Sequence, residues 1–174
     1  LLIEEDVEKA NILSNEVEFL NQTRRSTEKN VLEEAETQII QNSFTNIVYS
    51  DLWSKGVLGI VASRLIEGSY KPTIVMTDSD EQFLTGSVRS VSGFDVYEAL
   101  LKCEDNIFQF GGHKYAAGLK VKKSNFESFK TQFENTVKDS VSGKMFQKIF
   151  LYDLLINFSE ITMENVKILK RMSP

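Results

Sequence analysis

The sequence is poor in the residues on which several kinds of functional site depend. It holds one cysteine, Cys103, and one histidine, His113, among 174 residues. An internal disulfide, a multi-cysteine zinc site and a histidine-rich metal site are therefore excluded. Its apolar runs are also too short to span a bilayer. A lone thiol fits a reducing compartment, and we expect a cytoplasmic protein.

Common phosphate-binding and catalytic signatures are missing as well. The chain has no GxxxxGK[ST] loop and no GxGxxG motif after a strand. Its clustered carboxylates, Asp78, Asp80 and Glu81, are interpreted as a polar turn between two strands, with a cation site as the alternative. The sequence thus predicts no self-sufficient hydrolytic centre and no metal site in this chain.

The net charge of -5 conceals an uneven distribution. Residues 1–40 carry ten of the 25 acidic side chains and only four of the 20 basic ones, which leaves the rest of the chain with a net charge of +1. Eight lysines fall within residues 109–148, against three carboxylates. Because local charge governs attraction to phosphates, the acidic total does not exclude a nucleic-acid partner.

The spacing of apolar residues predicts a helical leader followed by an α/β domain. Residues 6–40 are expected to be helical in two pieces, separated near residues 21–30, with one apolar face made of Val7, Ala10, Leu13, Val17 and Leu20. Beyond residue 44, strands are predicted at 45–49, 73–77, 83–88, 116–122 and 148–156. Helices are predicted at 57–67, 96–102, from a capping box at 124–127 to about 140, and at 163–171, with a loop at 103–115. This alternation predicts an α/β fold, with a mixed sheet flanked by helices and preceded by a long connecting helix.

Two short clusters carry candidate ligand-binding groups. In Gly86–Ser90, alternation along a strand places Ser87 and Arg89 on the same side, where a hydroxyl and a planar guanidinium can clamp a phosphate. The alternative is an arginine in a salt bridge at the end of a strand. In Phe110–Lys114, paired glycines permit close approach of a ligand, and their amides can form an anion-binding concavity beside His113. The alternative there is a plain glycine turn.

Taken together, several segments resemble the DHH-associated domain of RecJ-type exonucleases. The resemblance rests on four motifs in the family's order: WSKGVLGIVASR at 53–64, KPTIV at 71–75, GSVRS with GFDVY at 86–97, and FGGHKYAAGL at 110–119. The segment with Arg24 and Arg25 is similar to the family's connecting helix. Ser54, where many relatives have histidine, and Val88, in place of alanine, depart from the pattern.

The resemblance implies a division of labour. It implies a connecting helix at 1–43, a DHH-associated nucleic-acid-binding domain at 44–144 and the truncated start of an OB-fold-type region at 145–174. The chain would be the part of a 5′-to-3′ single-stranded-DNA exonuclease of DNA repair and recombination that binds the strand and its 5′-phosphate. The parent's own DHH catalytic domain, absent from this chain, would hold Mn²⁺ or Mg²⁺. The chain alone is expected to be inactive, with no catalytic residue, no cofactor of its own and no membrane partner.

The same resemblance implies the residues of the site. The phosphate-binding set comprises Ser87, Arg89, Ser90, Gly111, Gly112 and His113. Further contacts to the strand's backbone are expected from Lys55, Arg64 and Lys114.

Three other interpretations stay open at this point. One is the substrate-binding domain of a DHH-family nano-RNA or cyclic-dinucleotide phosphodiesterase, which the long connecting helix and the tail disfavour. Another is a non-catalytic RNA-binding module such as the tail of an alanyl-tRNA synthetase, which would lack the GVLGIVASR segment. The third is a protein-interaction scaffold, which only the acidic helix supports.

Overall fold

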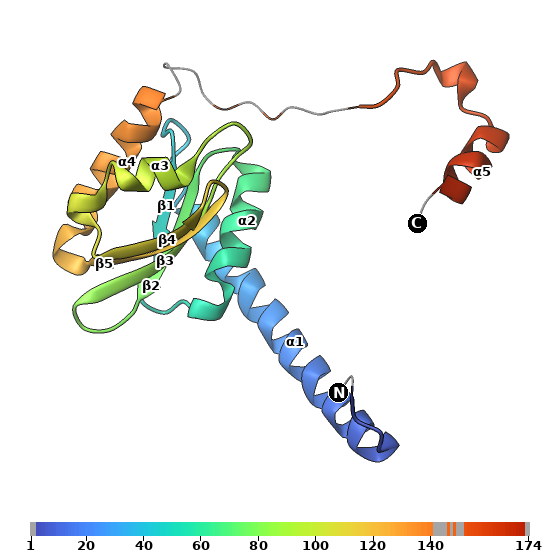
Figure 1. The fold of residues 1–174 in the computed structure, drawn as a ribbon, viewed down its shortest axis with the longest axis horizontal. Helices are drawn as coiled ribbons and strands as arrows, with labels where there is room; N and C mark the ends of the chain where they lie inside the picture. The colour runs from blue at the N-terminus through green and yellow to red at the C-terminus, as the bar shows by residue number, and fades with distance from the viewer. Residues whose placement is uncertain (1–2, 141–145, 147, 149–151, 173–174) are drawn as a thin grey trace.

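The computed structural model describes residues 3–140, 146, 148 and 152–172, and these contain a five-stranded mixed sheet with helices on both faces (Figure 1). The strands are β1 (Asn46–Tyr49), β2 (Thr73–Asp78), β3 (Phe83–Arg89), β4 (Gln109–His113) and β5 (Ala116–Lys122). In space they run in the order β1-β2-β3-β5-β4. The β1–β2 pair is parallel and the other three pairs are antiparallel. The predicted α/β fold with a mixed sheet is therefore confirmed.

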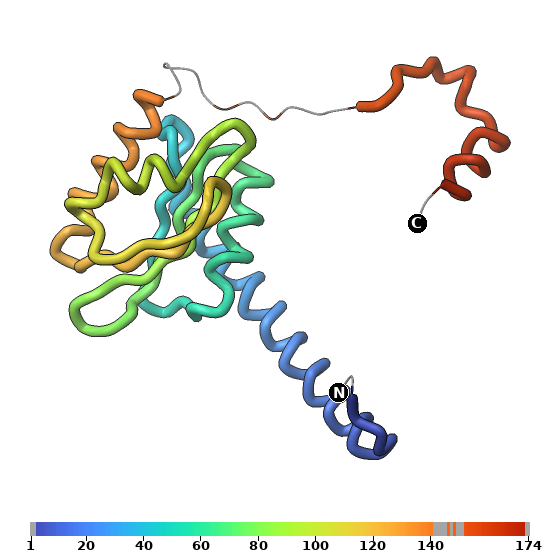
Figure 2. Tube along the Cα trace, viewed as in Figure 1, coloured from blue at the N-terminus to red at the C-terminus, as the bar shows by residue number. Residues whose placement is uncertain are grey.

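Five α-helices accompany the sheet in the described ranges. They are α1 (Val7–Thr37), α2 (Leu58–Gly68), α3 (Val96–Leu101), α4 (Phe126–Ser140) and α5 (Met163–Met172). Figure 2 shows α1 leading away from the sheet, with its C-terminal end nearest the domain. Short 3₁₀ turns precede α2 at Lys55–Val57 and α4 at Lys123–Asn125. None of the helices in the described ranges is long and apolar enough to cross a membrane.

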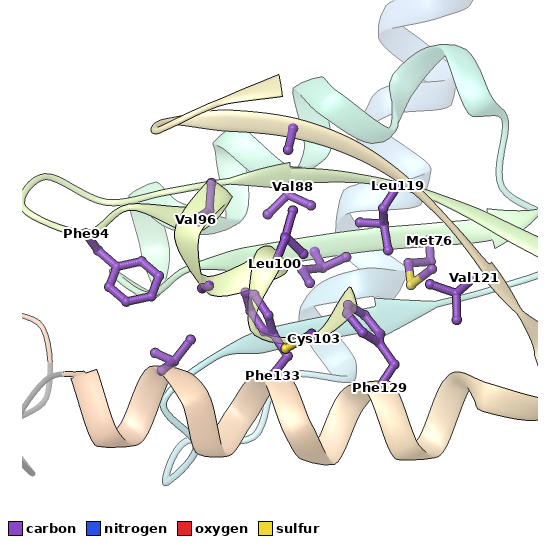
Figure 3. Packing of buried hydrophobic residues seen from close by; sticks show 14 of the residues in the cluster. Met76, Val88, Phe94, Val96, Leu100, Cys103, Leu119, Val121, Phe129 and Phe133 are labelled. Carbon is purple, nitrogen blue, oxygen red and sulfur yellow. The ribbon is translucent and has the colours of Figure 1, made fainter. Parts of the chain in front are cut away.

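One face of the sheet is closed by α3 and α4. Residues of β3 that point to this face, Leu84, Gly86 and Val88, are buried, whereas the alternate residues are only half-buried. Phe129 and Phe133 of α4 are four residues apart, so they share one side of the helix, and both are fully buried (Figure 3). This face is the larger hydrophobic core of the domain.

The opposite face is only partly covered. Helix α2 packs on β2 and β3, and its buried residues Val61 and Leu65 join Val48 and Val75 of the sheet in a second core. The C-terminal end of α1 completes it through Ala35 and through Glu34, which accepts a hydrogen bond of 2.8 Å from Trp53 Nε1. Beyond β3, this face of β5 and β4 carries exposed residues. A stretch of sheet next to α2 is thus left open.

Several expectations for individual segments are wrong. Helix α1 is continuous, because the polar residues 21–30 lie mainly on exposed turns and do not interrupt its backbone hydrogen bonds. Its predicted apolar face does not pack within the described residues, since Val7, Val17 and Leu20 are more than half exposed. The C-terminal third, through Val31 and Ala35, contacts the domain.

Two local motifs also differ from expectation. Residues 109–113, expected within a loop, form strand β4. Pairing with β5 stabilises this strand, although its residue types have a low strand propensity. The capping box does not form: the Ser124 hydroxyl donates to Asn125 Oδ1, and α4 begins at Phe126. The strand expected at 148–156 lies partly outside the described residues, and residues 152–156 are not a strand.

Candidate functional site

The open part of the sheet is defined by the register of three strands. Opposite residues of neighbouring strands point to the same face, so each row across β3, β5 and β4 shares one side. One row comprises Ser87, Gly118 and Gly111. The next comprises Arg89, Ala116 and His113. Val75, which packs under α2, is paired with Ser87, and this places both rows on the α2 side of the sheet. We call this surface of β3, β5 and β4 the open half-face.

The structure therefore brings two sequence motifs together. Arg89 and His113 lie in one row with a single strand between them, which separates their backbones by roughly 10 Å. Gly111, Gly118 and Ala116 provide a floor with little or no side chain between them. Cationic and polar groups thus stand on both sides of a flat strip that is free of bulky side chains.

Arg89 is held at the β3 side of the strip. One guanidinium nitrogen, Nη1, donates to the Val88 carbonyl at 2.8 Å and to Ser87 Oγ at 3.3 Å. None of the ion pairs found within the described residues involves Arg89. The alternative of an arginine in a salt bridge is therefore not what the structure shows, and the guanidinium retains donors for an anion.

The N-terminal turn of α2 lies against this arginine. A β-carbon added at Gly59 would stand 2.7 Å from Arg89 Nη2 and 3.1 Å from Ser87 Oγ, so a larger residue there would displace the guanidinium from its present position. The helix has no side-chain cap, since its N-cap residue is Val57. The partial positive charge of the α2 N-terminus therefore lies next to the Arg89 guanidinium, and no carboxylate among the residues described is paired with Arg89. Such an arrangement favours an anion.

His113 faces the strip from the β4 side and is exposed. The backbone N–H of Tyr115 donates to His113 Nδ1 at 3.3 Å. In the neutral ring this assigns the proton to Nε2, because Nδ1 acts as the acceptor. The outer nitrogen is therefore a donor that can reach a phosphate oxygen.

The two glycines of the second motif have different roles. Gly112 has a φ of 153°, and a β-carbon there would lie 2.4 Å from the Ala116 carbonyl oxygen. Only glycine fits this position of the tight β4–β5 hairpin. Gly111 has no atom within 4 Å of an added β-carbon. Because β4 is extended, the expected concavity of glycine amides is absent, and Gly111 contributes open floor.

The other expected site residues lie elsewhere or serve the fold. Ser90 donates its hydroxyl to the Phe94 carbonyl at 2.8 Å and so fixes the loop after β3. Lys55 Nζ donates to the Ser79 carbonyl at 3.1 Å. Arg64 forms an ion pair with Glu28 of α1 and is not brought to the open half-face. Lys114 is exposed at the hairpin turn beside His113, with its Nζ 5.5 Å from the Tyr115 ring centroid.

Sequence reasoning did not single out Gly59 and Gly118 as parts of the site. Gly118 lies within the FGGHKYAAGL motif and Gly59 within WSKGVLGIVASR, but neither motif by itself indicates a role for these glycines in the site. A glycine inside a helix is unfavourable for helix stability, so Gly59 was the available signal of a close contact. Its partner could not be named without the packing of α2 on β3.

Two of the three clustered carboxylates at the β2–β3 connection, Asp78 and Asp80, pair with lysines. Asp78 accepts hydrogen bonds from Lys123 Nζ and, at 2.7 Å, from the Tyr49 hydroxyl. The bond from Lys123, followed by that from Tyr49, lowers the pKa of Asp78, whereas the bond to Asp78 raises the pKa of Tyr49 to about 12. Asp80 pairs with Lys120 at 3.2 Å. No group of three or more His, Cys, Asp or Glu side chains that could hold a metal occurs in the described part of the chain.

Comparison with known protein families identifies the domain type. Residues 42–139 match the DHHA1 domain. Single-stranded-DNA-specific exonuclease RecJ of Bacillus subtilis is 32% identical over the whole of this chain, and RecJ of Haemophilus influenzae is 33% identical over 98% of it. The chain spans 23% and 32% of the length of these two relatives.

Solved structures show the same fold. The crystal structure of RecJ from Thermus thermophilus in complex with Mg²⁺ matches 79% of this chain with a TM-score of 0.74 and 30% sequence identity. This match covers 22% of the Thermus chain. A second structure of that protein contains Mn²⁺ and matches with a TM-score of 0.73.

Proposed function

The chain belongs to the DHHA1 domain family, in the form found in RecJ-type exonucleases, and from this premise we propose that its open half-face holds the 5′-phosphorylated end of single-stranded DNA. The observation that supports this most directly is the row of Arg89, Ala116 and His113, next to the row of Ser87, Gly118 and Gly111. Donors from two distant motifs converge on one strip whose glycine floor admits a ligand.

Ser87, Arg89 and His113 are the proposed phosphate ligands. The guanidinium supplies charge and a planar fork of donors, and the Ser87 hydroxyl and His113 Nε2 supply further hydrogen bonds. Gly111 contributes space, and Gly112 shapes the hairpin that carries His113. Ser90 acts by fixing the loop after β3, and Lys114 adds positive charge at the turn. We leave Lys55 and Arg64 out of the set, because their hydrogen bonds and ion pairs lead away from the strip.

The proposed division of labour leaves hydrolysis to another part of the parent protein. Asp78 and Asp80 are tied to lysines near the Phe83 end of β3, whereas the single histidine, His113, lies in the row of Arg89 at the other end. These residues do not fit a two-metal centre, and we derive no step through a metal in this chain. We propose that a separate DHH catalytic domain, outside residues 1–174, binds Mn²⁺ or Mg²⁺. The fragment then positions the strand and hydrolyses nothing by itself.

The proposed phosphate ligands also indicate which class of substrate the site accepts. Groups that grip phosphate carry no information about base identity, so binding at the open half-face should depend little on sequence. A strand-end site of this kind suits an exonuclease that acts in DNA repair and recombination. We propose the domain boundaries 1–43, 44–144 and 145–174 for the connecting helix, this domain and the start of a following OB-fold-type region.

The test is a titration of 5′-phosphorylated and 5′-hydroxyl oligonucleotides of one sequence. The wild-type chain should prefer the phosphorylated strand, and its affinity should fall steeply as salt is raised. Arg89→Ala should abolish the preference for the phosphorylated end while changing the unfolding free energy by less than about 1 kcal/mol. Arg64→Ala, a surface arginine off the strip, is the matched control and should retain the preference. A wild-type chain indifferent to the 5′-phosphate would refute the proposal.

A further inference from the structure

We propose that Phe108, Phe83 and Lys120 form a second subsite on the same sheet, which stacks a nucleobase of the strand beyond its phosphate-bound end. This inference rests on the proposed function of the open half-face and extends it. It assigns the DNA a direction along β3, from Arg89 toward Phe83.

An aromatic cluster with a cation stands at that end of the strands. The ring centroids of Phe83 and Phe108 are 4.6 Å apart at an interplanar angle of 53°. Lys120 Nζ lies 4.4 Å from the centroid of the Phe83 ring. Phe108 is 57% exposed, so burial in the core does not account for this residue. The cluster presents an aromatic surface whose inner ring is held in place by its neighbours.

The cluster is continuous with the phosphate strip. Phe83 alternates in phase with Ser87 and Arg89 along β3, and therefore points to the same face. Lys120 lies opposite Thr85 on one side and Gln109 on the other, in the row next to Ser87, Gly118 and Gly111. Phe83 precedes Ser87 by four positions in the strand, which is roughly 13 Å, a length that a few nucleotides can span.

A hollow lies between the phosphate strip and the aromatic cluster. It has a volume of about 320 Å³, and its lining includes Thr85, Gln109, Gly111, Gly118 and Lys120. The members of this set come from the three strands of the open half-face. A strand whose end is held between Arg89 and His113 can therefore continue over the glycine floor toward Phe108 without leaving the surface.

The chemistry of the cluster suits a base and its phosphate. Every nucleobase has a π-face, so stacking on an exposed ring gives affinity without sequence preference. Lys120 is paired with Asp80 at 3.2 Å, and this contact keeps its amine beside the Phe83 ring. The amine is only partly shielded there and remains close enough to the hollow to attract the strand's backbone. We therefore assign stacking to Phe108, and ring orientation together with charge to Phe83 and Lys120.

The competing explanation is that Phe108 and Phe83 merely cover the end of the sheet. In that case Phe108→Ala should lower stability and leave DNA binding unchanged. Stacking predicts the opposite pattern, because an exposed ring contributes little to the core while a base that loses its platform binds more weakly. The two explanations are therefore separable by measuring binding and unfolding on the same variant.

The experiment compares two 5′-phosphorylated strands, one of thymidine nucleotides and one with abasic sites after the first nucleotide. Phe108→Ala should weaken binding of the thymidine strand about tenfold and leave binding of the abasic strand unchanged. Phe158→Ala, which removes a ring that is 95% exposed and outside the sheet, is the matched control and should bind both strands as wild type does. Phe108→Trp should bind the thymidine strand and lose tryptophan emission on doing so, whereas the buried Trp53 should respond little.

The outcomes separate this inference from the function on which it rests. Equal affinities of Phe108→Ala and wild type for the thymidine strand, or an equal loss on both strands, would overturn the stacking subsite. An emission of Phe108→Trp that is unaffected by the thymidine strand would do the same, including where Phe108→Ala does not fold. If Arg89→Ala keeps the preference for a 5′-phosphate, or wild type has none, the phosphate site itself is wrong.

Discussion

The two faces of strands β3 and β5 differ in chemistry, although residues that alternate along the same strands form both of them. Under α3 and α4, Leu84, Val88 and Leu119 are buried in an apolar core. On the other side, Ser87 and Arg89 alternate with these residues and remain half-exposed beside a glycine floor. Since a single step along a strand changes the face, adjacent residues serve different purposes. Stability and ligand binding should accordingly respond to different substitutions in one short segment.

The largest expected effect is on the covered face. Phe133→Ala removes a fully buried ring from the core between α4 and the sheet. It should lower the free energy of unfolding by about 3–5 kcal/mol, as measured by urea denaturation. Arg89→Ala, on the open half-face, serves as the comparison and should cost less than about 1 kcal/mol. Similar losses in the two variants would show that the faces are not energetically distinct.

The second effect tests the hairpin that joins β4 to β5. Gly112→Ala would place its β-carbon 2.4 Å from the Ala116 carbonyl oxygen at a φ that other residues rarely adopt. We expect a loss of about 1–3 kcal/mol in unfolding free energy, together with faster hydrogen exchange of the β4 and β5 amides. An unchanged exchange pattern would mean that the hairpin tolerates the side chain and that Gly112 is not required for its shape.

The smallest effect concerns the polar contact at the edge of the sheet. Hydrogen bonding to Asp78 raises the pKa of Tyr49 to about 12, above the ordinary value of 10.0. A group whose pKa is raised by folding stabilises the protein fully below its unfolded pKa, and this contribution is lost as the pH rises through the folded value. Wild-type stability should therefore decline from pH 10 toward 12 more steeply than that of Tyr49→Phe. Parallel declines would remove Tyr49 from this pH dependence.

The sequence alone predicted the part of the site that lies within one strand. Alternation places Ser87 and Arg89 together without any knowledge of tertiary structure. The convergence with His113 needed the strand order, and β4 escaped prediction because residues 109–113 contain two glycines and no β-branched residue. Gly59 was also not predicted as part of the site, because its role depends on how closely α2 approaches β3 in the tertiary structure.

The long helix shows a second limit of sequence patterns. Its apolar spacing correctly predicts helix but does not reveal which part of the apolar face is covered. Val31 and Ala35 are buried, whereas Val7 and Val17 are exposed in the described residues. Periodicity reports which side of a helix is apolar, and the partner of that side must come from the tertiary structure.

The central claim, that the glycine floor of the open half-face receives the strand's phosphate, is tested most directly at Gly111. No atom lies within 4 Å of a β-carbon added there, so Gly111→Ala should leave the unfolding free energy unchanged to within about 0.5 kcal/mol. Its methyl group enters the strip in the row of Ser87 and Gly118, next to the row of Arg89 and His113, without altering any charge. Titration with a 5′-phosphorylated oligonucleotide should show weaker binding for Gly111→Ala and a further loss, about tenfold overall, for the bulkier Gly111→Val. Wild-type affinity in both folded variants would contradict the account.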